Sequence, residues 1–186
     1  MTNYIAFLRG INVGGHNKIK MAELKQMFEE MGFIRVKTYI QSGNVLFESD
    51  EKEPFILKRI EHEIKTVFGL TISVVIRTST ELERITGECP FSKEAISDAE
   101  VSSEGECLYV ALLLEDPPQG KIEGLSVFRT EYEDFRFEGR EVYLLFQKGI
   151  RNSKLANNVQ KLGVPVTIRN WKTMNKLTAL VKEIEA

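Results

Sequence analysis

The order of strand-like and helix-like segments in residues 4–77 is the feature that most constrains the fold. Strands are recognised by β-branched and aromatic residues, and helices by apolar residues three and four positions apart. The segments are strands at 4–9, 36–41, 44–49 and 70–77, a helix at 21–31, and a second helix from Pro54 to the stop at Gly69. The two middle strands flank Ser42-Gly43 as a hairpin. This β-α-β-β-α-β order is the split βαβ arrangement of the ferredoxin-like fold.

The same order begins again at Cys107. The segments there are strands at 107–115, 134–138, 141–147 and 164–169, a weak helical segment at 121–127, a helix with Leu155, Val159 and Leu162 that ends at Gly163, and a C-terminal helix. Gly139-Arg140 forms the second hairpin turn. The sequence therefore predicts an α+β protein of two ferredoxin-like halves (alpha-beta plaits, βαββαβ) related by duplication.

Matching helix starts support the duplication. Thr78 follows the last strand of the first half and Asn170 follows the last strand of the second, and both residue types are good N-caps. Glu81 completes a capping box with Thr78. We expect a first half at 1–87, a linker at 88–106, and a second half at 107–186 that includes the C-terminal helix.

The linker at 88–106 is acidic. Its six acidic residues and single lysine leave a formal charge of −5. We expect a solvated connection with a short helix near Ser92 to Ala95.

Composition excludes several classes of protein. The chain has 25 Lys and Arg against 27 Asp and Glu, so it is not a polycation held on nucleic acid by charge. It begins without a signal peptide and its longest strongly apolar run, 109–114, is too short to cross a bilayer, so we expect a cytosolic protein with no membrane partner. Cys89 and Cys107 stand apart from any CxxC motif or Cys/His cluster, so no metal site is expected. No catalytic residue, reaction or cofactor can be assigned.

A first candidate ligand site lies at the edge where the loop after the first strand meets the first hairpin. The glycines of this loop allow a close approach of the backbone to a ligand, and the start of the following helix directs unpaired N–H groups to the same edge. This loop lacks the residues of a Walker A motif. The candidate residues are Arg9, Gly10, Asn12, Gly14, Gly15, Lys18, Gln41, Ser42 and Asn44, with His16 and Lys20 as further cations.

A second candidate site is a basic edge of the second half, where two helices begin. Ser153 or Asn152 can cap one helix and Asn170 the other. The predicted ligand-binding residues are Arg151, Lys154, Arg169, Asn170 and Trp171, with Lys148 and Lys172 nearby. The alternative is that the Arg and Lys side chains are solvated or paired with neighbouring acids, and that the Trp171 ring is buried.

Five stretches resemble a bacterial family of proteins of unknown function, DUF1697. They are LRGINVGG (8–15), KMAEL (20–24), TYIQSGNVLF (38–47), SKL (153–155) and RNWKT (169–173). The resemblance spans nearly the whole chain and implies an α+β protein of two alpha-beta plait halves. It implies no activity.

Three functions are compatible with the sequence. The first is binding of a small anionic ligand that bears phosphate or carboxylate, at the glycine-rich loop and the basic edge. The second is binding of single-stranded nucleic acid, with Tyr39, Phe47, Phe137 and Tyr143 as stacking residues. The third is a protein-interaction module that uses the acidic linker. The sequence leaves open the ligand, the oligomeric state, and whether the two polar edges share one cleft.

Overall fold

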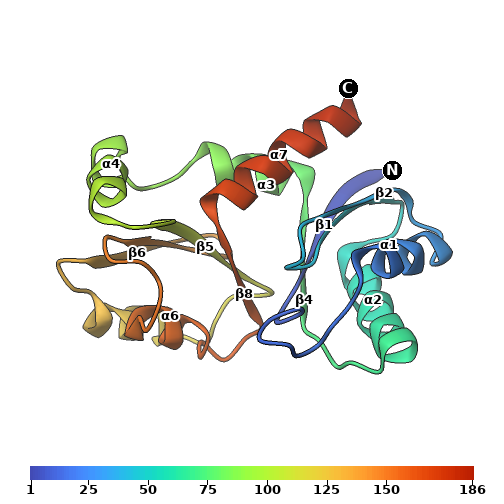
Figure 1. Cartoon of the computed structure of the whole chain (residues 1–186), viewed down its shortest axis with the longest axis horizontal. Helices are drawn as coiled ribbons and strands as arrows, with labels where there is room; N and C mark the ends of the chain where they lie inside the picture. Colours follow the sequence, from blue (N-terminus) through green and yellow to red (C-terminus); the bar gives the residue numbers. More distant parts are fainter. The chain divides into compact units, whose positions relative to one another are not determined.

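A computed structural model describes all 186 residues and shows a mixed α+β protein with two four-stranded antiparallel sheets and seven α-helices (Figure 1). The chain forms two compact units. One unit contains Met1–Glu83 together with Leu177–Ala186, and the other contains Arg84–Lys176.

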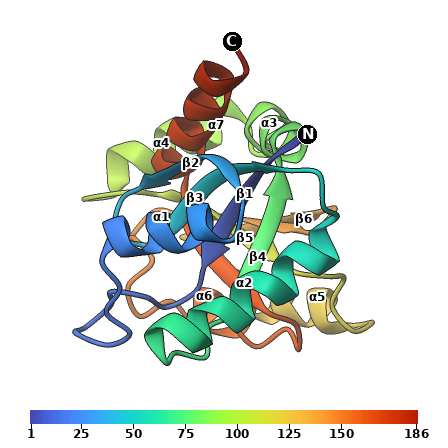
Figure 2. The ribbon, with the colours of Figure 1, turned by 90° about the vertical axis from the view of Figure 1, so that its right-hand side faces the viewer.

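The first sheet has the strand order β2-β3-β1-β4. Its elements are β1 (Thr2–Leu8), α1 (Met21–Glu30), β2 (Ile34–Tyr39), β3 (Asn44–Ser49), α2 (Glu53–Phe68) and β4 (Val74–Thr78). β1 pairs antiparallel with both β3 and β4. Helices α1 and α2 lie side by side over one face of this sheet (Figure 2).

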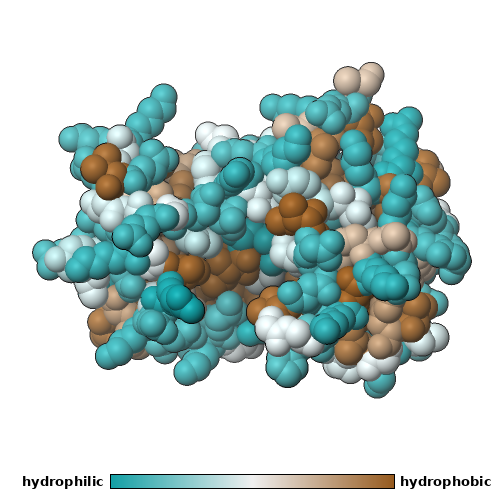
Figure 3. Space-filling model, viewed as in Figure 1, coloured by the Kyte–Doolittle hydropathy of each residue, from teal (hydrophilic) through white to brown (hydrophobic).

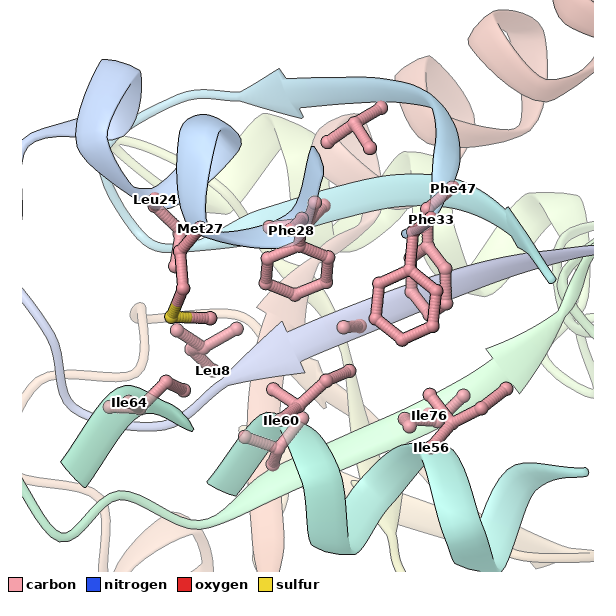
Figure 4. Close-up of a cluster of buried hydrophobic side chains, with 14 of the residues drawn as sticks. Leu8, Leu24, Met27, Phe28, Phe33, Phe47, Ile56, Ile60, Ile64 and Ile76 are labelled. Carbon is pink, nitrogen blue, oxygen red and sulfur yellow. The ribbon is translucent and has the colours of Figure 1, made fainter. Parts of the chain in front are cut away.

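The core of this unit lies between the two helices and the sheet. Phe28 of α1 and Ile60 of α2 point toward Phe47 of β3, and all three are at most 1% exposed (Figure 4). The rings of Phe28 and Phe47 meet edge to face at 5.3 Å between centroids. In the sequence, the helical spacing of Leu24 and Phe28 in α1 and of Ile60 and Ile64 in α2 predicts these inward-facing sides of the helices.

Both faces of β1 are buried. Tyr4, Ala6 and Leu8 belong to the core under α1 and α2, whereas Ile5 and Phe7 point to the opposite face and are also inaccessible to solvent. Because side chains alternate along a strand, the unbroken apolar run of β1 requires cover on both sides.

The second sheet has the strand order β6-β7-β5-β8. The elements after β4 are α3 (Ser79–Gly87), α4 (Lys93–Ser102), β5 (Leu108–Leu113), α5 (Lys121–Gly124), the 3-10 helix η1 (Leu125–Phe128), β6 (Glu133–Glu138), β7 (Glu141–Phe146), α6 (Lys154–Val159), β8 (Val166–Asn170) and α7 (Trp171–Glu185). The weak helical pattern at 121–127 thus forms one short α-helix and a 3-10 turn. The expected hairpin turn at Gly139-Arg140 is confirmed.

The helix caps predicted from the sequence are confirmed. The N–H of Glu81 donates to the Thr78 hydroxyl at 3.2 Å, and the N–H of Thr78 donates to the Glu81 carboxylate at 2.9 Å. Asn170 accepts from the N–H of Thr173 at 2.8 Å, and this bond caps α7. The short helix expected near Ser92 is longer than predicted, because α4 continues to Ser102 after its Ser92 cap.

The first hairpin turn differs from the prediction. Tyr39 pairs with Asn44, so the turn contains four residues instead of two. The reason is the side chain of Asn44, which is fully buried and donates to the Tyr39 carbonyl at 2.9 Å and to the Ser42 hydroxyl at 3.0 Å. These bonds hold a wider turn in which Gly43 has φ +83°.

The end of α7 completes the first unit. Within that unit Asn3 donates to the Glu185 carboxylate at 3.0 Å, and the Arg35 guanidinium donates to the carbonyl of Ile184 at 3.3 Å. Leu177 and Val181 are buried. The last ten residues are therefore part of the folded first unit.

The surface is mainly hydrophilic on the face shown in Figure 3. A few large apolar side chains are exposed, among them Val13, Ile40 and Val101. None of the helices has the length and apolar character needed to span a bilayer.

Candidate functional site

The loop between β1 and α1 has an unusual backbone. Five of its residues have positive φ angles: Gly10 (+67°), Asn12 (+54°), Gly14 (+58°), Gly15 (+77°) and Asn17 (+49°). Two consecutive positive φ angles in the middle of a tight turn are the signature of a type I′ turn. The turn is closed by the N–H of His16, which donates to the carbonyl of Val13 at 3.0 Å.

Asn12 ties this loop to the first hairpin. Its side-chain amide donates to the carbonyls of Ile19 at 3.0 Å and Gln41 at 2.8 Å, and its oxygen accepts from the N–H of Ile19 at 2.9 Å. The N–H of Asn12 also donates to the carbonyl of Asn17 at 3.1 Å. The expectation that the loop meets residues 41–44 is therefore confirmed, and Asn12 makes the connection.

A hollow of about 690 Å³ lies between this loop, the start of α1 and the first hairpin turn. Five of the residues named from the sequence line it, namely Asn12, Gly15, Lys18, Lys20 and Gln41. The other lining residues are Ile19, Met21 and Glu23. The hollow thus combines two ammonium groups, one carboxylate, amide groups and apolar side chains.

Helix α1 begins at this hollow without a side-chain cap. Lys20 stands at the N-cap position, and no side chain there accepts a hydrogen bond from the first turn. The N–H groups of a first helical turn lack partners within the helix, and the helix dipole adds partial positive charge at the same end. Together with Lys18 and Lys20, this gives the hollow a positive local potential.

The remaining first-site residues are not among those that line the hollow. Arg9 is exposed directly after β1, and its N–H donates to the carbonyl of Ser73 at 3.0 Å. Gly10 accepts a bond from the Asn17 side chain, and Gly14 lies at the exposed loop tip. Ser42 and Asn44 bond to each other inside the turn. These residues shape the site without lining the hollow.

The proposed basic edge of the second half does not contain the Arg169 side chain. Val166 and Ile168 pack on the α6 side of the sheet, so Thr167 and Arg169 point to the opposite face. Arg169 is 8% exposed and donates to the Thr167 hydroxyl at 2.7 Å and to the Ile168 carbonyl at 3.1 Å. Burial lowers the pKa of its guanidinium to about 10.

Arg151 and Lys154 are exposed on the other side of that sheet, at the start of α6. Ser153 between them caps α6, since its hydroxyl accepts from the N–H of Ala156 at 3.0 Å. Trp171 is half-buried with its ring 6.3 Å from the ring of Tyr143. The expectation that Arg169 joins Arg151 and Lys154 is therefore wrong.

A second hollow, of about 570 Å³, was not predicted. It lies in the second unit, where Phe91 and Asp98 of the α4 region face Tyr132 and the strand β6. Its two arginines, Arg129 and Arg136, both pair with Asp134, at 2.8 and 2.7 Å. The lining residues come from distant parts of the sequence and form no motif, so no sequence signal could have found this hollow.

Comparison with known proteins identifies the family. A family model described as "Protein of unknown function (DUF1697)" matches residues 1–143. The chain belongs to this family. The DUF1697 match includes the whole first hollow, whereas α6, β8 and α7 lie beyond it.

A solved structure has a similar fold. The chain is similar to the conserved bacterial protein SP0830 from Streptococcus pneumoniae, with 25% sequence identity, a TM-score of 0.72, and coverage of 96% of this chain and 97% of that chain. No curated protein matches the chain.

Proposed function

We propose that the protein binds a small anionic ligand in the hollow beside the glycine-rich loop. The observation that carries this proposal is the placement of Lys18 and Lys20 at one hollow with the uncapped start of α1. Ammonium groups and helix N-termini both favour anions such as phosphate or carboxylate. The size of the hollow is in the range typical of small-molecule sites.

The loop is preorganised for ligand binding. The three side-chain bonds of Asn12 fix the loop against Gln41 and Ile19, so few residues need to become ordered when a ligand binds. Such preorganisation reduces the entropic cost of binding.

Binding of single-stranded nucleic acid is less well supported. Phe47 is 1% exposed and Tyr143 is inaccessible, so neither ring offers a face to a base. In the protein-interaction alternative, the acidic segment 88–106 would bind a protein partner. Substitutions at the loop lysines would then leave the affinity for that partner unchanged.

The test is a titration of the full chain with inorganic phosphate and with acetate, followed by two-dimensional NMR. We expect chemical-shift changes at residues 12–23 and 41, and a weakening of binding by Lys18→Gln or Lys20→Gln of roughly tenfold. Lys52→Gln is the matched control, because Lys52 also stands at an N-cap position without a side-chain cap, at the start of α2. Equal loss in all three variants would contradict the proposal.

We also propose that the two sheets are ferredoxin-like plaits related by duplication. The strand orders β2-β3-β1-β4 and β6-β7-β5-β8 support this. In each sheet the strands lie in the order second, third, first and fourth when they are counted along the chain. Arg77 and Arg169 occupy equivalent buried positions, and each donates to the carbonyl of the residue before it. In this proposal the repeats are 1–87 and 107–186, joined by the linker 88–106.

A further inference from the structure

The charges that line the loop hollow limit how much negative charge on a ligand they can balance. Lys18 and Lys20 are its two cationic side chains, and Glu23 is its single acidic one. The lining side chains therefore carry one net positive charge. One negative charge on a ligand is balanced there, whereas a second negative charge would face Glu23 without a further cation.

The loop backbone is poorly suited to surround a phosphate group. Loops that cradle phosphate direct several successive N–H groups at its oxygens. Here the N–H groups of Asn12, His16 and Ile19 are already bonded inside the loop, at 3.1, 3.0 and 2.9 Å. The Asn12 side chain is also occupied, since its nitrogen donates twice and its oxygen accepts once.

Apolar groups form part of the same hollow. Ile19 lines it but is only 3% exposed, so the accessible apolar surface comes from Met21, which is half-buried at its wall. A ligand consisting only of an oxyanion would leave this apolar surface in water, whereas a hydrocarbon group would cover it.

We propose that the ligand is a carboxylate monoanion joined to an apolar group, such as an aromatic ring or a branched hydrocarbon chain. This inference rests on the proposed function, because it specifies the ligand of the same hollow. The carboxylate lies between Lys18 and Lys20, and the apolar group lies against Met21. Glu23 disfavours dianions.

The test uses four probes on the full chain at about pH 8, where a phosphate monoester is largely dianionic. Phenylacetate is the amphipathic monoanion, phenyl phosphate is the dianion, 2-phenylethanol lacks the charge, and inorganic phosphate lacks the apolar group. Dissociation constants are measured by NMR titration. We expect phenylacetate to bind at least about tenfold more tightly than each of the other three.

Glu23→Gln tests the role of charge directly, because it raises the net charge of the lining side chains from +1 to +2. We expect this variant to bind phenyl phosphate at least about fivefold more tightly than the unmodified protein does, with a smaller gain for phenylacetate. Met21→Gln tests the apolar part, and it should weaken phenylacetate binding while leaving acetate binding unchanged. Melting temperatures of both variants show whether they are folded.

The outcomes separate this inference from the proposed function. The ligand class is wrong, and the anion site remains, if phosphate or phenyl phosphate binds the unmodified protein as tightly as phenylacetate does. The same conclusion follows if Glu23→Gln leaves the ratio of the dissociation constants of phenyl phosphate and phenylacetate unchanged. If none of the three anions shifts residues 12–23, the anion site itself is wrong. Tight binding of 2-phenylethanol would show that the hollow binds apolar groups without regard to charge, and this also contradicts the inference.

Discussion

Gly43 lies so close to Ile11 that position 43 has no room for a side chain. A Cβ built there would be 2.6 Å from Cδ1 of Ile11 and 3.0 Å from Cβ of Leu8. Ile11 is 1% exposed, so it has little space into which to move. The hairpin turn and the start of the glycine-rich loop are thus packed directly on one another.

Gly43→Ala should therefore destabilise the protein by about 2–4 kcal/mol, because a positive φ and overpacking both oppose the new methyl group. Urea unfolding measures the change in the free energy of unfolding. Gly10→Ala is the control, since Gly10 has φ +67° but nothing within 4 Å of the built Cβ. It should cost only about 1–2 kcal/mol. Equal losses would show that the contact with Ile11 is unimportant.

Asn12→Ala should loosen the glycine-rich loop and lower stability by about 1–3 kcal/mol, because it removes three hydrogen bonds and leaves the N–H of Ile19 unpaired. Asn17→Ala is a matched variant, because Asn17 also has a positive φ but makes one side-chain bond, to the carbonyl of Gly10. Hydrogen exchange of the loop amides should accelerate more in Asn12→Ala. Faster hydrogen exchange of the loop amides in Asn17→Ala than in Asn12→Ala would mean that Asn12 is not the main residue that holds the loop in place.

Arg169→Ala should reduce stability and leave anion affinity at the loop hollow unchanged. Arg169 is buried and bonded to Thr167 and Ile168, so its loss removes bonds and packing together, at a cost of about 2–4 kcal/mol. Arg169→Lys keeps the charge but not the planar fork, so it should recover only part of the loss. Arg151→Ala, at an exposed position, should change stability by less than about 0.5 kcal/mol. A variant at 169 with normal stability would overturn the structural role.

Tyr143 should make stability fall at alkaline pH. Burial raises the pKa of this phenol above its ordinary value of 10.0, and its hydroxyl donates to the Ile85 carbonyl at 3.0 Å. Because the folded pKa is raised, the stabilisation is complete below the unfolded pKa and is lost as pH rises above it. The stability difference between the unmodified protein and Tyr143→Phe should therefore shrink by up to about 1.4 kcal/mol per pH unit above about pH 10. Urea midpoints from about pH 8 to pH 11 measure it, and a constant difference would contradict the prediction.

Removal of residues 177–186 should destabilise the first unit strongly. The segment contains the buried side chains Leu177 and Val181, each worth about 1.5–3 kcal/mol of burial. A fragment of residues 1–87 lacks this segment and should not unfold cooperatively in urea. The exposed bond between Asn3 and Glu185 contributes little, so Asn3→Ala is the control. A cooperative, monomeric fragment of residues 1–87 would show that the segment is dispensable.

Local signals in the sequence were sufficient for much of the fold. Thr78 with Glu81 and Asn170 predicted helix starts because a cap is a bond between near neighbours. The meeting of the glycine-rich loop with Gln41 was also predicted, because the strand order places both at one edge.

Features that depend on distant packing were not predicted. Arg169 was expected at a ligand-binding edge with Arg151 and Lys154, but it is buried, since the sequence does not show what covers its face of the strand. The four-residue turn depends on the buried amide of Asn44, which a Ser-Gly signal does not reveal. The importance of Asn12 became clear only from its three side-chain hydrogen bonds to Ile19 and Gln41.

The assignment of Leu177–Ala186 to the first unit has a consequence for synthesis on the ribosome. These residues are made only after the whole of Arg84–Lys176, so the second unit is available to fold first although its sequence comes later. Domains of many proteins fold in the order in which they emerge. In this protein the first unit is completed only by residues that are made after the second unit, and a nascent chain that stalls before Leu177 carries an incomplete first unit.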